Sequence, residues 1–269
     1  MTMKSMLLAV PAIVASFAMP VHAADQTLND IVASDHRTAT NVARDAHRRP
    51  AEVLAFFGLQ PDMKVAEIWP GGSGYFAEII APYLSDQGEY TAVVATLHAT
   101  SDYQKNANTA LFSKFGKHPE KFAKVKLADI NKGEYDFAEA ESLDMIFTFR
   151  NLHNWMMGGY EAPMLEAFFG ALKPGGHLAV VDHRLDGSPY ADKQVWGGYV
   201  SQAHMIEAIE AAGFKLRSSS EMNANPKDTK DYEKGVWTLP PTYRLRDVDR
   251  AKYEAIGESD RATLLFQKQ

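Results

Sequence analysis

The stretch Glu67-Ile68-Trp69-Pro70-Gly71-Gly72-Ser73-Gly74 indicates the fold of this chain more clearly than any other. It follows the strand-like segment 64–69 and precedes residues 75–84, whose apolar side chains recur at helical spacing. We therefore predict a glycine-rich turn that connects a strand to a helix. Glycine allows positive φ and lets a ligand approach the backbone closely. Such a turn can also be an ordinary tight connection, so the surrounding segments must decide between the two interpretations.

The rest of the chain alternates between strand-like and helix-like segments. We predict further strands at 90–96, 122–127, 143–149, 177–181, 214–219 and 261–267, and helices at 50–58, 103–115, 162–172 and 202–212. Segment 143–149 is nearly all apolar, which is typical of a parallel strand covered on both faces. The alternation predicts an α/β protein with a mostly parallel sheet and helices on both faces.

Two regions fall outside the alternation, residues 24–49 before the first strand and residues 221–260 between the last two strands. Long loops inside a compact domain are usually functional lids or disordered segments. The second region contains Gly235-Val236-Trp237-Thr238-Leu239-Pro240-Pro241, which is too aromatic and too stiff for a disordered linker. We predict a helical N-terminal extension and an ordered flap.

The first 23 residues have the three-part layout of a secretory signal peptide. Lys4 precedes an apolar run over 6–18, and the segment ends in Val21-His22-Ala23. The run is shorter than the roughly 20 residues of a membrane helix, although an uncleaved anchor or a buried first helix is a second interpretation. We expect cleavage after Ala23, a mature domain over 24–269, a periplasmic or secreted location, and no stable membrane insertion after cleavage.

Composition narrows the choice of partner. With 28 basic and 34 acidic residues, the chain has no overall charge that would attract nucleic acid, so a small molecule is the expected partner. The sequence has no cysteine, which excludes disulfides, thiolate nucleophiles and cysteine metal sites. A phosphate-binding P-loop would need a lysine before the helix, and none is present. Glu67 instead suits a ligand with a cationic amino group.

Four segments in order resemble the class I S-adenosylmethionine-dependent methyltransferases, in particular an exported subgroup of predicted methyltransferases. Residues 67–74 are similar to the family's first motif, acid-x-Gly-x-Gly-x-Gly, with Trp69 and Ser73 where glycines are usual. Asp129-Ile130, 143–149 and 172–178 are similar to its later segments. The resemblance covers about half of the predicted mature chain, and it implies a Rossmann-like seven-stranded sheet whose last strand is antiparallel.

The resemblance also implies S-adenosylmethionine as cofactor. The residues that it places at the cofactor are Glu67, Gly71, Gly72, Gly74, Asp129 and Ile130. We add Arg150 to the predicted cofactor residues because it follows the fourth strand, where it could orient cofactor or substrate. Asp129 would accept a hydrogen bond from the adenine amino group. The family usually has an acid at the end of the second strand to hold the ribose, but this sequence has Ala95 there. Thr96, His98 or a residue from elsewhere would then hold the ribose.

Polar residues follow the fourth and fifth predicted strands, at 150–155 and 182–184. Methyl transfer is an in-line displacement, so the protein has to position the acceptor and remove its proton. We predict His153 as the general base, His183 as the alternative base and Asn151 as an orienting group, although each histidine has a structural alternative. These two histidines and Asp182 could instead bind a metal, but their spacing is generic, and we predict no metal.

Substrate contacts are predicted from charge and aromatic content. Arg44 and Arg48 are four residues apart, so on a helix they would repel each other unless an anionic partner, or Asp45 and solvent, offset them. Trp155 and Trp237 border the expected crevice and could contact a planar acceptor or belong to the core.

Two functions remain open from the sequence. The first is an exported S-adenosylmethionine-dependent methyltransferase that acts on a small molecule. The second is a non-catalytic exported binding protein with the same fold. The export signal and the missing second-strand acid favour the second function.

Overall fold

A computed structural model describes residues 22–269 of the chain. The predicted signal peptide therefore lies almost entirely outside the described residues. The described chain begins with helix α1 (His22–Val32). None of the described helices combines the length and the apolar character that a bilayer crossing requires.

A seven-stranded sheet forms the centre of the molecule. Its strands, in spatial order, are β3 (Lys126–Asp129), β2 (Glu89–Val94), β1 (Lys64–Ile68), β4 (Leu143–Phe149), β5 (Leu172–His183), β9 (Arg261–Lys268) and β8 (Phe214–Ser220). The first five of these are parallel, and β9 runs antiparallel to both β5 and β8. The predicted Rossmann-like sheet with an antiparallel last strand is therefore confirmed. Strands β6 (Val195–Trp196) and β7 (Tyr199–Val200) form a separate small hairpin.

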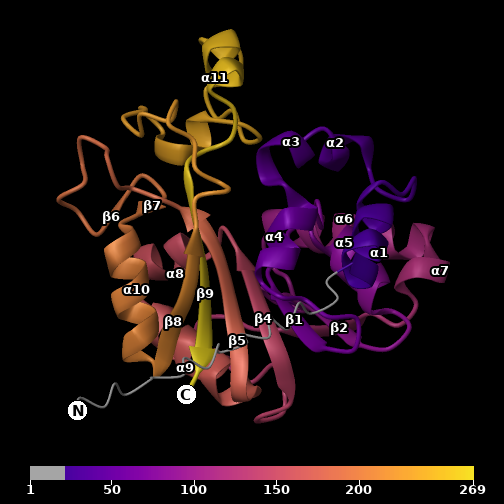
Figure 1. The fold of residues 1–269 in the computed structure, drawn as a ribbon. Coiled ribbons are helices and arrows are strands. Elements are labelled where there is room, and N and C mark those ends of the chain that lie inside the picture. The colour runs from indigo at the N-terminus through magenta and orange to yellow at the C-terminus, as the bar shows by residue number, and fades with distance from the viewer. Residues whose placement is uncertain (1–21) are drawn as a thin grey trace, which may run out of the picture.

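Helices cover both faces of the sheet, and each face has its own apolar core (Figure 1). One face carries α1, α4 (Pro50–Phe56), α5 (Ala77–Leu84) and α6 (Asp102–Lys117), and the other carries α8 (Leu152–Gly158), α9 (Glu161–Ala171) and α10 (Gln202–Ala211). Strand β4 supplies Phe147 to the first core and Ile146 to the second. The nearly unbroken apolar run of β4 follows from this double burial.

The predicted third strand begins too early. Phe122 ends the short helix α7 (Pro119–Phe122), and the strand starts only at Lys126. Proline suits the first turn of a helix, and Phe122 packs against Phe115 in the first core, with ring centroids 5.1 Å apart. This packing requirement is a tertiary effect that the local apolar pattern does not reveal.

The segments outside the alternation meet above the carboxyl ends of the parallel strands (Figure 1). The N-terminal segment forms α2 (Ala39–Val42) and α3 (Asp45–Arg48), and the flap 221–260 contains the 3-10 helix η1 (Gly235–Thr238) and α11 (Arg250–Ile256). Arg44 joins the two segments through an ion pair with Glu258, Nε to Oε1 2.8 Å. The flap is ordered around its own apolar cluster. The order of the parallel strands reverses between β1 and β4, and open α/β sheets bind ligands at such a point.

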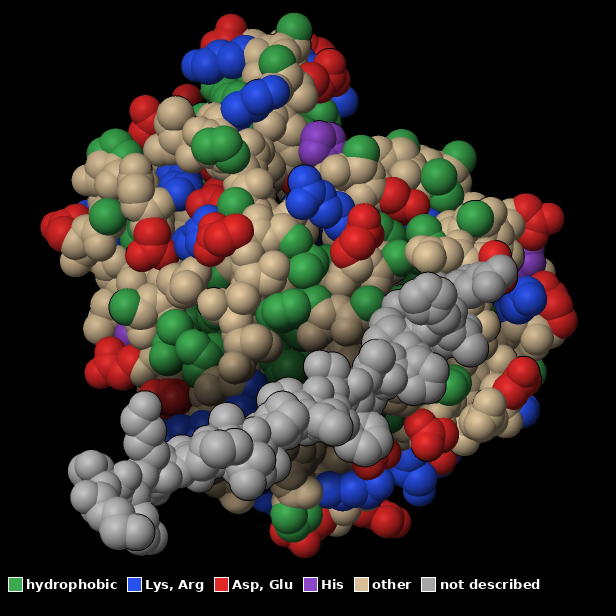
Figure 2. All heavy atoms as spheres, in the orientation of Figure 1, with side chains coloured by type: hydrophobic (Ala, Val, Ile, Leu, Met, Phe, Trp, Pro, Cys, Tyr) green, Lys and Arg blue, Asp and Glu red, His purple; other side chains and the backbone are tan. Residues whose placement is uncertain are grey.

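Charged side chains of both signs lie on the face of the molecule that Figure 2 displays. Figure 2 shows lysine and arginine side chains (blue) intermixed with aspartate and glutamate side chains (red) over the face that it displays. This mixture agrees with the near balance of 28 basic and 34 acidic residues.

Candidate active site

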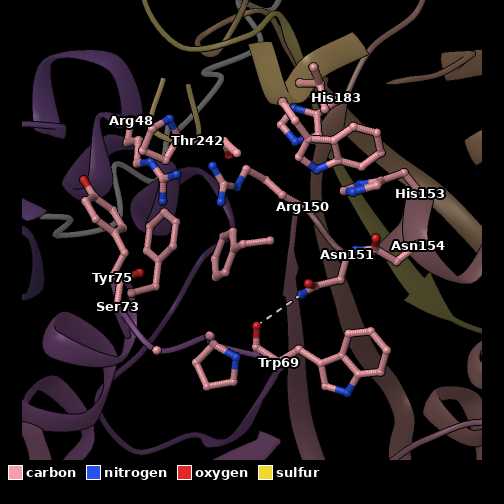
Figure 3. A pocket seen from close by; sticks show the side chains of 18 of the residues that line it. Arg48, Trp69, Ser73, Tyr75, Arg150, Asn151, His153, Asn154, His183 and Thr242 are labelled. Atoms are coloured by element: carbon pink, nitrogen blue, oxygen red, sulfur yellow. Dashed lines mark hydrogen bonds between the residues drawn. The ribbon is translucent and has the colours of Figure 1, made fainter. Parts of the chain in front are cut away.

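Two adjoining cavities lie at the junction of β1 and β4. The main cavity has a volume of about 630 Å³ and the second cavity about 540 Å³. Their shared lining residues are Trp69, Pro70, Gly71, Tyr103, Asn151 and Asn154. Both volumes fall in the range of small-molecule sites, roughly 300–1,000 Å³, and the shared wall allows one elongated ligand to occupy both. The main cavity is bordered by the turn after β1, residues 149–154, His183 and the flap (Figure 3).

Trp69 takes the place of a glycine in the turn and has the left-handed conformation expected there, with φ 51°. A non-glycine residue in that conformation costs roughly 1–2 kcal/mol. The indole offsets this cost, because its Nε1 donates to the carbonyl oxygen of Ile130 at 3.0 Å and its ring packs edge-on against Trp155. The departure from the family motif thus keeps the backbone geometry that glycine would provide.

Asn151 holds the same turn from the side of β4. Its Nδ2 donates to the carbonyl oxygen of Ile68 at 2.8 Å and lies 3.4 Å from that of Trp69 (Figure 3). Asn151 is largely buried, although it lines both cavities. The group that Asn151 orients is therefore, first of all, the backbone at the start of the glycine-rich turn.

The glycines of the turn have different roles. Gly71 lines both cavities, has φ 68°, and would place a Cβ where no atom lies within 4 Å. A Cβ on Gly72 would lie 3.2 Å from the Cα of Ala107, and one on Gly74 would lie 2.8 Å from Leu111 Cδ1. Gly71 therefore faces the ligand space, whereas Gly72 and Gly74 allow α6 to pack closely against the turn.

Glu67 is a buried carboxyl group on the wall of the main cavity, 2% exposed. Its Oε2 accepts a hydrogen bond from the Tyr90 hydroxyl at 2.6 Å, and no described lysine or arginine forms an ion pair with it. Burial raises the pKa of Glu67 to about 7, and the hydrogen bond from Tyr90 only partly opposes this shift. A cationic group that enters the cavity would supply the missing counter-charge.

The raised pKa predicts that binding of a cationic ligand depends on pH. Below the folded pKa, Glu67 is protonated and neutral, so the attraction is lost as the pH falls. Between about pH 6 and about pH 8 we expect the affinity for S-adenosylhomocysteine, which carries an ammonium group, to rise roughly tenfold. Calorimetric titration measures this rise. Glu67→Gln should remove it, and an equal rise in that variant would show that Glu67 is not the titrating group.

His153 and Asp182 form a buried pair beside the main cavity. The ring Nδ1 of His153 lies 2.8 Å from Asp182 Oδ1, and the backbone N–H of His153 donates to Asp182 Oδ2 at 3.1 Å. Because an ionised carboxylate only accepts hydrogen bonds, the pair places the hydrogen on Nδ1 and leaves Nε2 as an acceptor at the cavity (Figure 3). This arrangement suits a general base.

His183 lies next to this pair, with the two imidazole centroids 5.1 Å apart. Its Nδ1 is 2.6 Å from the hydroxyl of Ser259. Burial, together with His153 and Arg150, holds the pKa of His183 well below its usual value, so His183 is neutral near pH 7. The lowered pKa makes His183 a weaker base than an ordinary histidine, which ranks it behind His153.

A metal remains the second interpretation of these side chains, because ligand atoms of His153, Asp182 and His183 lie within 4.8 Å of one another. However, the Asp182 carboxylate is already used by the His153 ring and by the backbone N–H groups of His153 and His183. The local geometry thus assigns Asp182 to orienting His153, and the absence of a metal stays a prediction.

Several of the predicted cofactor and substrate residues line the main cavity, namely Glu67, Gly71, Gly72, Arg150, Arg48 and Trp237. Two predicted substrate residues do not. Trp155 is fully buried in the second core, and Arg44 pairs with Glu258 behind the cavity wall. We therefore correct the prediction for both. Each is close in sequence to a residue that does reach the cavity, Asn154 for Trp155 and Arg48 for Arg44, and the sequence does not show on which side of the backbone its side chain lies.

Asp129 and Ile130 also lie outside the cavity walls. Asp129 Oδ2 accepts from the backbone N–H of Leu97 at 2.8 Å, and the side chain of Ile130 is buried. The neighbouring Asn131 lines the second cavity instead. The adenine contact of Asp129 stays a prediction, because no described residue donates a hydrogen bond to its other carboxylate oxygen.

The second cavity contains polar residues that the sequence did not reveal. They are Ser101, Gln104, Asn108, Asn131 and Asn154. Asn108 Nδ2 donates to the carbonyl oxygen of Thr96 at 2.8 Å, which leaves its side-chain oxygen free for a ligand. Thr96 and His98 do not line the cavity. Gln104 and Asn108 share one face of α6, but that helix is polar over most of its length, so no pattern separated them from solvent-facing residues.

Solved structures with a similar fold include S-adenosylmethionine-dependent methyltransferases and a cyclase. A methyltransferase from Aquifex aeolicus matches with a TM-score of 0.58 and 14% identity over 91% of this chain and 98% of its own. The [4+2]-cyclase SpnF matches with a TM-score of 0.56 and 16% identity over 90% and 92%. Geranyl diphosphate C-methyltransferase from Streptomyces coelicolor A3(2), solved with Mg²⁺, geranyl diphosphate and S-adenosyl-L-homocysteine, matches with 0.55 and 12% over 97% and 91%.

No protein-family model matches the sequence, and no curated protein matches it. At identities of 12–16%, these likenesses establish the fold. The chain has the Rossmann-like fold of the S-adenosylmethionine-dependent methyltransferases.

Proposed function

We propose that this protein is an S-adenosylmethionine-dependent methyltransferase that acts on a small molecule. The observation that supports it most is the buried Glu67 carboxyl group, which lies beside an open glycine turn without a cationic partner among the described residues. The His153–Asp182 pair borders the same cavity. A cation-binding group and a general base therefore lie around one space that can hold a ligand.

The residues present fit the cofactor. Glu67 would hold the ammonium group, and the backbone at Gly71 would lie against the chain of the ligand. The second cavity would take the nucleoside, with Leu111 and Tyr160 as apolar contacts and polar groups on α6 for the ribose. These polar groups would take the place of the ribose-binding acid that the family usually has at the end of the second strand, where this chain has Ala95. When bound, the cofactor supplies an electrophilic methyl carbon on a sulfonium.

The chain's own residues would remove the proton that the acceptor loses. His153 Nε2 would accept this proton when the acceptor takes up the methyl group. Asp182 would stabilise the imidazolium that results. The products would be the methylated acceptor and S-adenosylhomocysteine, and the proton would pass from His153 to solvent.

The alternative is a binding protein with this fold that does not transfer methyl groups. It is favoured by Ala95, by the difficulty of supplying a cytosolic cofactor to an exported protein, and by the [4+2]-cyclase among the structural neighbours, whose name refers to a different reaction. An assay of S-adenosylhomocysteine release over a panel of small acceptors separates the two. Release that depends on an acceptor supports the enzyme, and ligand binding without release from any acceptor supports the binding protein.

We also propose that the protein is exported, on the basis of the layout of residues 1–23. N-terminal sequencing of the protein from the envelope fraction of its native host is expected to begin at Ala24 or within a residue or two of it. Protein recovered from the cytosol with Met1 intact would contradict export.

A further inference from the structure

A cluster of buried and half-buried arginines lies against the main cavity with little negative charge to balance it. We call Arg44, Arg48, Arg150 and Arg261 the arginine cluster. Glu258 is the carboxylate that Arg44, Arg48 and Arg261 all share, at N–O distances of 2.8, 2.9 and 3.0 Å. The guanidinium group of Arg150 makes no hydrogen bond or ion pair with any described residue, although Arg150 lines the main cavity. Each of the other three keeps a buried guanidinium nitrogen without a partner.

The charges of this cluster repel one another. Burial and the neighbouring Arg150 hold the pKa of Arg48 well below its usual value, and burial lowers the pKa of Arg150 to about 10, with Arg44 and Arg261 acting in the same direction. Burial alone would raise the pKa of Glu258, but the arginines around it hold it below its usual range. Glu258 is thus ionised, and its single negative charge is shared by several cations.

Nearby groups of the protein do not remove the imbalance. The ring of Tyr75 lies 4.5 Å from Arg48 Cζ, but an aromatic ring is neutral. Asp182 attracts Arg150 from a distance and is held by His153. A cavity of about 10 Å³ between Arg48, Arg150 and Arg261 is large enough for about one water. A water there could satisfy hydrogen bonds, but it adds no charge.

Arg48 and Arg150 are the members of the cluster that reach the main cavity. Figure 3 shows their side chains extending toward each other from opposite walls, with His153 and His183 beyond Arg150. Trp237 of the flap lines the same space, and its ring lies 6.1 Å from that of His153. The guanidinium groups, the general base and a flat apolar surface therefore face one volume. Guanidinium groups bind carboxylates and phosphates through paired hydrogen bonds.

We propose that the methyl acceptor is a small organic oxyanion, whose carboxylate or phosphate group binds between Arg48 and Arg150 while its remaining part lies against Trp237 and the His153 imidazole. The statement that this anion is the methyl acceptor rests on the proposed function. The anion site itself does not. It also moves Arg150, which the sequence analysis predicted at the cofactor, to the acceptor side of the main cavity.

The test measures binding of benzoate and phenyl phosphate, with benzamide as the neutral analogue, by calorimetry on the whole protein with and without S-adenosylhomocysteine. We expect both anions to bind and benzamide to bind at least roughly tenfold more weakly. Arg150→Gln should weaken the anions roughly ten- to a hundredfold. Arg217→Gln makes the same chemical change on the exposed face of β8 and should have no effect.

Thermal unfolding separates ligand binding from a merely structural role. If Arg150 serves an anion, Arg150→Gln should unfold at the same or a higher temperature than the wild type without anion, because a repelling charge is gone, and it should lose the stabilisation by benzoate. A lower unfolding temperature with unchanged anion affinity would overturn the proposal, as would equal binding of benzamide and benzoate. Binding of S-adenosylhomocysteine without either anion overturns only the anion site. Binding of the anions without S-adenosylhomocysteine keeps the anion site and overturns the proposed function.

Discussion

His153→Gln is expected to lower kcat for methyl transfer by roughly 10²–10⁴-fold and to leave the affinity for S-adenosylhomocysteine within about threefold of the wild type. The reason is the geometry of the His153–Asp182 pair, which leaves Nε2 of His153 as a proton acceptor at the cavity. Glutamine retains a polar side chain for Asp182 but cannot accept the proton near neutral pH. Steady-state kinetics with an acceptor that must be deprotonated measures the loss.

Two further variants serve as controls for this prediction. Asp182→Asn should reduce kcat because an amide no longer orients the imidazole as a carboxylate does. His183→Gln should have the smaller effect, because the lowered pKa of His183 makes it a weak base and its Nδ1 already bonds to Ser259. A larger loss for His183→Gln than for His153→Gln would transfer the base role to His183 and contradict the assignment.

Gly71→Val is expected to weaken binding of S-adenosylmethionine roughly ten- to a hundredfold or more, because a branched side chain would occupy the space that both cavities share. Overpacking of this kind costs roughly 1–3 kcal/mol, and each 1.4 kcal/mol corresponds to about tenfold in affinity. Valine at φ 68° also strains the backbone. The loss of affinity must therefore be separated from a loss of stability.

Gly58→Val is the matched control for that strain. Gly58 has φ 75° and, like Gly71, would place a Cβ where no atom lies within 4 Å, but it follows α4 and lines neither cavity. Both variants should lose similar stability in thermal unfolding, while the affinity loss should occur only in Gly71→Val. Equal affinities in folded Gly71→Val and wild type would mean that the turn does not contact the cofactor.

Much of the fold could be predicted because it depends on local patterns. The apolar run 143–149 gave β4 within a residue, and the glycine turn after β1 was recognised from residues that are adjacent in sequence. The strand that begins at Lys126 was misplaced, because the helix before it is stabilised by contacts between Phe122 and Phe115, on separate elements. Boundaries that depend on tertiary packing are not visible in a local pattern.

The site was predictable where strands end, and much less so elsewhere. His153, Asp182 and His183 follow neighbouring parallel strands, so their proximity follows from the sheet. The arginine cluster joins residues about 210 positions apart, such as Arg48 and Glu258, and only the packing of the flap against α3 brings them together. Trp155 was predicted at the site but is buried in the core, because an aromatic residue next to a functional loop can belong entirely to the core.

Calorimetric titration of the purified protein with S-adenosylhomocysteine tests the central claim most directly. The Glu67 carboxyl group, the open turn at Gly71 and the two joined cavities predict saturable binding of one ligand per chain, competition by S-adenosylmethionine, and weaker binding in Glu67→Gln. Absence of any heat of binding at millimolar ligand, with the protein shown to be folded by circular dichroism, would contradict the account.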